Sequence, residues 1–275
     1  MNHQLVALNS ATATDEVTVY VKGFLARGEK AESFEAWLAG HEAMADSHGW
    51  SRAALGYHWE SGDLRKLALP IAGGVKTAWD IYRLVRHTRR IAPLATAGWF
   101  LAEQGAALSA RFVTQFIEAR RHSSARADDL AACLQALAQQ HERVRVIGHS
   151  LGCRQVIEAS SLLLAAERPD EIHLFAPACL ESEVGDKLED LAREHAYLYF
   201  TGLDHVLDIS FRAMTQGRAI GAVGLERDYA GLTSRDVSSE FDFWVHTEYK
   251  NRFSRFTSRS SERIENEATH HDELP

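Results

Sequence analysis

Five residues, Gly148 to Gly152, restrict the fold of this chain more than any other segment. They have the sequence GHSLG and lie between a short apolar run, Arg143 to Ile147, and a helix-compatible run from Leu151 to Glu167. A serine between two glycines, where a strand passes into a helix, is typical of a sharp turn that exposes the serine hydroxyl. Small residues are required there because strand and helix pack closely beside the serine. The pattern predicts that Ser150 is a nucleophile and that the backbone N–H of Leu151 stabilises an oxyanion; a glycine-rich turn with an incidental serine is the alternative.

The rest of the chain alternates between short apolar runs and helix-length segments. Helices are expected over 30–47 and 151–167, and strands over 17–21, 53–58, 144–147, 171–175 and 196–200. This alternation predicts an α/β fold with a mostly parallel central sheet covered by helices on both faces. Residues 64–121 have helix-like sequence without a convincing strand, which predicts a helical insertion, a cap or lid over the sheet. We expect one domain over residues 1–260 and a loose polar tail over 261–275.

A nucleophilic serine needs a histidine base and an acid that orients it. In folds with this turn the partners follow in the order serine, acid, histidine. Asp204 follows the expected strand 196–200 at its carboxyl end, where open α/β sheets assemble their sites, so we predict it as the acid; Asp208 is the alternative. His246 is predicted as the base, because the two other histidines beyond Asp208 lie in the polar tail.

A second oxyanion donor is expected in the loop after an early strand. The segment VTVYVKGFLARGE fits that place. Gly23 would let the backbone approach the substrate, and the N–H of Phe24, or else that of Leu25, would complete the oxyanion hole. His149, directly before Ser150, could line the same pocket.

Composition argues against several classes of function. Lys and Arg number 30 against 38 Asp and Glu, a formal net charge of −8, which argues against a nucleic-acid partner. Three cysteines without CxxC spacing, a start without a secretory leader, and no apolar run of about 18 residues predict a cytoplasmic location. Phosphate-binding glycine loops and a convincing set of metal ligands are also lacking in the sequence, so we expect neither a cofactor nor a metal.

Several stretches together resemble one family, the α/β-hydrolases of unknown function that include the transmembrane and coiled-coil domain-containing proteins of eukaryotes. The similar stretches are VKGF, LGYHWES, VIGHSLGCRQVI and YFTGLDHVLDISFRAMTQGRAIGAVGL, between residues 17 and 246. The pair Trp59–Glu60 and the DHVL segment are more particular to this family than the central motif. The resemblance implies an α/β-hydrolase fold with Ser150, Asp204 and His246 at the positions of the catalytic triad.

The chain also departs from that family. Cys153–Arg154 stands where members commonly carry an Ala-Arg pair, and the membrane segments of the eukaryotic members are not found. Basic residues at helical spacing in the insertion suit either a lid or peripheral contact with a membrane surface; they are Lys76, Arg83, Arg86 and Arg90.

The residues together predict an esterase-like or lipase-like serine hydrolase that cleaves a carboxylic ester of a small molecule or lipid. A catalytically silent module that binds lipid or a protein partner, and an acyltransferase with the same triad, are the alternatives.

Overall fold

The computed structural model describes residues 5–10, 15–24, 34–59, 61–62, 69–71, 74–76, 113–242 and 245–257, with the backbone alone at 209–210 and in the two segments between 69 and 76. Its main feature is a seven-stranded sheet in the order β1-β3-β2-β6-β7-β8-β9. β1 pairs antiparallel with β3, and every other neighbouring pair in this sheet is parallel. The strands are β1 (Leu5–Ala7), β2 (Glu16–Val21), β3 (Ala54–Tyr57), β6 (Arg143–His149), β7 (Glu171–Phe175), β8 (His195–Phe200) and β9 (Leu232–Asp236).

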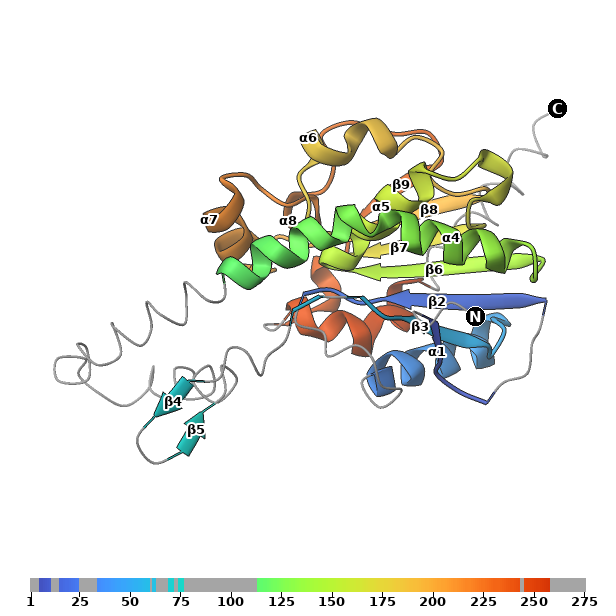
Figure 1. Cartoon of the computed structure of the whole chain (residues 1–275), viewed down its shortest axis with the longest axis horizontal. Helices are drawn as coiled ribbons and strands as arrows, with labels where there is room; N and C mark the ends of the chain where they lie inside the picture. Colours follow the sequence, from blue (N-terminus) through green and yellow to red (C-terminus); the bar gives the residue numbers. More distant parts are fainter. Residues whose placement is uncertain are drawn as a thin grey trace, which may run out of the picture.

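Helices cover both faces of this sheet (Figure 1). On one face lie α4 (Ala127–Ala138), α5 (Leu151–Ser161) and the helical residues 113–125, and on the other lie α1 (Glu35–His48) and the helical residues 245–257. Shorter helices follow the later strands: α6 (Glu181–Val184), α7 (Arg212–Thr215), α8 (Ile220–Val223), the π-helix η5 (Val206–Phe211) and the 3-10 turns η3 (Ala165–Glu167), η4 (Gly185–Lys187) and η6 (Ser238–Glu240). The architecture is α/β with a mostly parallel sheet, as the sequence predicts.

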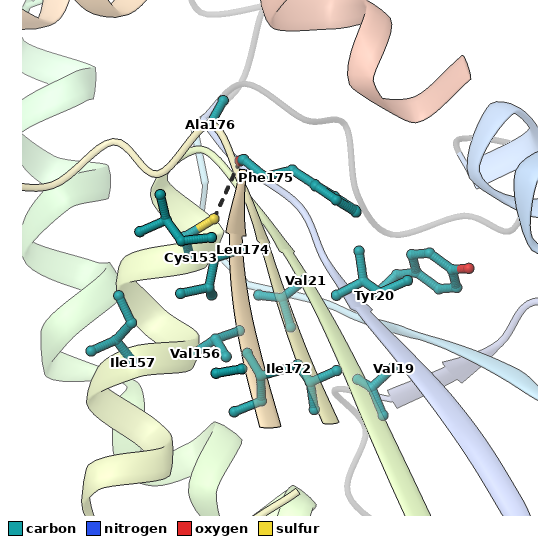
Figure 2. Close-up of a cluster of buried hydrophobic side chains, with 14 of the residues drawn as sticks. Val19, Tyr20, Val21, Cys153, Val156, Ile157, Ile172, Leu174, Phe175 and Ala176 are labelled. Carbon is teal, nitrogen blue, oxygen red and sulfur yellow. Dashed lines mark hydrogen bonds between the residues drawn. The ribbon is translucent and has the colours of Figure 1, made fainter. Parts of the chain in front are cut away.

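Alternation of side chains along the strands divides the core into two layers. Figure 2 shows Cys153, Val156 and Ile157 of α5 on one side of the strands, and Tyr20 and Phe175 pointing to the other. On that second side, aromatic rings from the sheet pack against α1 and residues 245–257, with Phe175 and Phe253 centroids 5.8 Å apart. This aromatic layer fixes the segment 245–257 to the sheet.

All five predicted strands are present, within two residues of their expected ends. β1 and β9 were not predicted, because β1 has three residues and β9, with the sequence LTSRD, lacks an apolar run. The predicted helix over 30–47 is present as α1, which begins at Glu35 and ends at His48, one residue beyond its predicted end. Gly49 follows with a left-handed φ of 67°, typical of a helix C-terminus. The helix predicted over 151–167 ends at Ser161.

The predicted helical insertion, 64–121, is corrected where it is described. It contains a two-stranded antiparallel pair, β4 (Leu69–Ile71) and β5 (Gly74–Lys76), so Lys76 belongs to a strand and not to the predicted basic helix. Residues 113–121 are helical, as predicted. The other basic residues of the insertion and the predicted tail, 261–275, lie outside the described residues. Over the described parts of the chain, no helix combines the length and apolar character that crossing a membrane requires.

Candidate active site

Ser150 lies in the sharp turn between β6 and α5. Its backbone has φ 56° and ψ −123°, a left-handed conformation that is unfavourable for a residue with a side chain. Neighbouring backbone holds it there: the Ser150 N–H donates to the carbonyl of Phe175 at 3.0 Å, and the Ser150 carbonyl accepts from the N–H groups of Cys153 and Ala178 at 3.1 Å each. The structure therefore contains the strained turn that the GHSLG segment predicts.

Both glycines of GHSLG are required by close backbone packing. A Cβ atom on Gly148 would lie 3.0 Å from Cys153 Cα. On Gly152 it would lie 2.7 Å from the carbonyl oxygen of Lys22, and closer still to that of Val21. The start of α5 thus packs directly on the end of β2, with no room for a side chain between them.

Three side chains from separate elements form a hydrogen-bonded chain. Asp204 Oδ2 accepts from Nδ1–H of His246 at 2.7 Å, and Nε2 of His246 lies 3.1 Å from Ser150 Oγ. The carboxylate can only accept, so Nδ1 carries the proton and Nε2 is left to accept from the serine hydroxyl. The other carboxylate oxygen of Asp204 accepts from the N–H groups of Val206 and Leu207, both at 3.1 Å. The structure brings together the three residues predicted from the sequence.

Asp204 is fully buried yet remains suited to the ionised form. Burial acts to raise the pKa of this carboxyl, but the neighbouring His246 and the N–H of Leu207 outweigh burial and lower the pKa. The alternative acid, Asp208, lies elsewhere, 3.9 Å from the guanidinium of exposed Arg218. Asp204, and not Asp208, is hydrogen-bonded to His246.

His149 makes a contact that sequence reasoning missed. Its Nε2–H donates to the backbone carbonyl of His246 at 2.9 Å, and the two rings lie 5.0 Å apart. Burial and then the proximity of His246 lower the pKa of His149 to about 3, so the ring stays neutral at physiological pH. His149 therefore anchors the backbone of His246, whose ring faces Ser150. Its predicted place in a pocket stays a prediction.

The loop after β2 approaches Ser150 closely at Gly23. A Cβ atom there would lie 2.5 Å from Ser150 Cβ and 3.1 Å from its Oγ. Phe24 follows, and its ring makes an edge contact with Phe116 at 5.4 Å; Leu25 lies outside the described residues. The first N–H groups of a helix have no acceptor within it, which favours Leu151 as a donor at the start of α5. The oxyanion roles of Leu151 and Phe24 stay predictions.

Lys22, directly before Gly23, is an unexpected buried amine. Its side chain is 6% exposed, and Nζ lies 3.7 Å above the ring of Phe34. Burial, with a contribution from Lys250, lowers the pKa of Lys22 to about 7. The Lys22 carbonyl accepts from Nε1–H of Trp59 at 2.8 Å, which anchors the start of the loop. Glu60, which follows Trp59 in the Trp59–Glu60 pair, lies outside the described residues.

Within the described segments, no three His, Cys, Asp or Glu side chains are grouped so that they could hold a metal ion. No protein-family model matches the chain, and no curated protein matches it.

Proposed function

We propose that the protein is a serine hydrolase of the α/β-hydrolase fold that cleaves a carboxylic ester through an acyl-enzyme. The observation that carries the proposal is the continuous chain from Ser150 Oγ through His246 to buried Asp204, at 3.1 and 2.7 Å, with the serine in a strained turn. The sequence resemblance to α/β-hydrolases of unknown function, carried by the GHSLG segment and by YFTGLDHVLD, agrees with this assignment.

The first step is attack by Ser150 on the ester carbonyl. As Oγ bonds to the carbonyl carbon, its proton passes to Nε2 of His246, and the Asp204 carboxylate stabilises the imidazolium that forms. The carbonyl oxygen becomes an oxyanion, which the N–H groups of Leu151 and Phe24 stabilise. His246 then returns the proton to the departing alcohol, and the acyl group remains on Ser150.

Water completes the cycle. It gives a proton to His246 while its oxygen attacks the acyl carbon, and collapse of the second tetrahedral species releases the carboxylic acid and restores the Ser150 hydroxyl. His149 keeps His246 in place during both steps, because its hydrogen bond is to the His246 backbone and leaves both ring nitrogens of His246 available.

The substrate class is supported by the apolar surroundings of the site. Phe24, Phe116 and Phe211 form a row of edge contacts with centroids 5.4 and 6.0 Å apart, beginning at the residue after Gly23. Leu203 and Val206, on either side of Asp204 in the sequence, are 39% and 46% exposed. A hydrophobic acyl group, such as that of a lipid ester, suits such surroundings better than a sugar does.

Labelling with a fluorophosphonate probe tests the nucleophile. The wild-type protein, Ser150→Ala, His246→Ala and the control Ser182→Ala, which changes an exposed serine, are treated side by side. We expect labelling of the wild type and the control only, followed by turnover of p-nitrophenyl esters with a preference for longer acyl chains. A folded wild-type protein that is not labelled would favour a catalytically silent binding module. Faster product formation in added alcohol, with ester instead of acid as product, would identify an acyltransferase.

A further inference from the structure

A groove of about 650 Å³ lies where the helical residues 113–125 meet α5 and α6, apart from the hydrogen-bonded chain of Ser150. Its walls contain three arginines and one carboxylate. The lining residues are Ile117, Arg120, Arg121, Ser124, Ala125, Arg154 and Glu183. The volume is that of a site for a small organic molecule. The sequence does not reveal this groove, because its arginines come from two helices that meet only in the folded chain.

The charges of the groove do not cancel. Glu183 accepts from Arg120 through one oxygen and from Arg154, at 3.3 Å, through the other. Arg121 has no ion-pair or hydrogen-bond partner in the part of the chain that the structure describes. The lining has three guanidinium groups and one carboxylate. Beside it, Glu158 lies 3.7 Å from Arg154 and 3.2 Å from Lys187, so four positive and two negative groups leave a net charge of +2 on a chain whose formal net charge is −8. Such a local excess of positive charge attracts anions.

One of the arginines also keeps hydrogen-bonding capacity. The Nε atom of Arg120 has no hydrogen-bond partner among the described residues, whereas Nε of Arg154 lies 3.7 Å from a carboxylate oxygen of Glu158. Guanidinium groups donate in a planar fork that matches the oxygens of a phosphate, and several of them together favour an anion that carries more than one charge. The groove thus combines excess positive charge with a guanidinium N–H, that of Arg120 Nε, that is unpartnered in the described part of the chain.

An apolar edge adjoins these arginines. Val113 and Ile117 lie one turn apart in the helical residues 113–125 and are 36% and 44% exposed. On another face of this helix Phe116 contacts Phe24, next to Gly23 and Ser150. A ligand with its anionic group among the arginines could therefore place an apolar part along Val113 and Ile117.

We propose that this groove binds a ligand through a phosphate group, which Arg120, Arg121 and Arg154 hold, with an apolar part of the ligand on Ile117. A lipid headgroup and a soluble phosphate ester share this chemistry. The proposal goes beyond the proposed function and does not depend on it, because binding in the groove requires no reaction at Ser150.

Titration calorimetry on the full chain in the Ser150→Ala background tests the groove without ester cleavage. The probes are inorganic phosphate, dihexanoyl phosphatidic acid, and dihexanoylglycerol, which has the same acyl chains and no phosphate. Arg121→Gln removes the exposed, unpaired arginine of the groove, and Arg212→Gln makes the same change at an exposed position on α7 outside it. Neither side chain is buried, so both variants should fold.

We expect both phosphate probes to bind, and Arg121→Gln to weaken their binding about tenfold or more while Arg212→Gln leaves it unchanged. Tighter binding of phosphatidic acid than of inorganic phosphate would identify the bound phosphate group as a lipid headgroup. Equal binding of these two probes would identify it as part of a soluble phosphate ester. Failure of both phosphate probes to bind, or equal weakening by the two arginine variants, would overturn the proposal. Neither result alters the fluorophosphonate labelling of Ser150, so the two proposals fail separately.

Discussion

Replacing Gly23 by alanine should impair the site more than it impairs the fold. The added Cβ would lie 2.5 Å from Ser150 Cβ and 2.9 Å from the His149 carbonyl oxygen. The first distance is about 1 Å shorter than an ordinary carbon–carbon contact. Ser150 cannot move away readily, because its N–H and carbonyl are bonded to Phe175, Cys153 and Ala178. The loop after β2 must therefore shift by about 1 Å, and this overpacking costs about 1–3 kcal/mol of unfolding free energy.

A shift of this size would also displace the N–H of Phe24 from the proposed oxyanion hole. Loss of one such donor lowers kcat by about 10²–10³-fold. The assay compares kcat for p-nitrophenyl esters with the urea unfolding midpoint. The matched control is Gly202→Ala, since a Cβ on Gly202 would meet no atom within 4 Å. Gly202→Ala should retain both properties. Wild-type turnover and stability in Gly23→Ala would refute the inferred approach of this loop to the nucleophile.

Three further predictions follow from the site. Asp204→Asn should lower kcat about 10⁴-fold, because the asparagine amide would turn an N–H donor toward Nδ1 of His246 and force the wrong tautomer of the ring. Ester kinetics measure this loss on a variant whose circular dichroism spectrum is unchanged. A loss of kcat below tenfold would contradict the prediction. His149→Phe removes the side-chain donor to the part-buried carbonyl of His246 and should cost about 0.5–1.5 kcal/mol in urea unfolding, with slower fluorophosphonate labelling. Unchanged stability and labelling would show that the bond is dispensable. Lys22 has a pKa of about 7 in the folded protein and about 10.4 in an unfolded chain. The unfolded chain thus binds more protons between these two pKa values, so the unfolding free energy of the wild type should rise from pH 7 to pH 10 relative to that of Lys22→Met. Urea unfolding of both proteins at pH 7 and pH 10 measures this difference, and a fall with pH would contradict the prediction.

The sheet was largely predictable because its central strands are apolar on both faces. The five runs from 17–21 to 196–200 are the five central strands β2, β3, β6, β7 and β8. The edge strands were not predictable in this way. β9 is polar and joins the sheet through its pairing with β8, and β1 is too short to carry a pattern. Whether such a segment forms a strand depends on its pairing partner in the sheet and not on its local sequence.

The meeting of Ser150, Asp204 and His246 was predictable because parallel strands bring their carboxyl ends to one edge, so chain order alone narrows the choice of partners. The chemistry of these residues stays a prediction. The surroundings of His149 and Lys22 were not predictable. His149 binds a carbonyl 97 residues away, and any residue type could have supplied it. Lys22 follows an apolar strand, where its sequence position suggests a solvated end and not a place over the Phe34 ring.

The hydrogen-bonded chain of the site draws on residues 150, 204 and 246, and its last member begins the segment 245–257. During synthesis the ribosome releases these residues in that order, and a domain folds as a unit. Until Tyr249 and Phe253 pack on Phe175, His246 is not held beside Ser150. If the protein is the proposed serine hydrolase, the nascent chain gains reactivity toward esters only after the segment 245–257 has packed on the sheet.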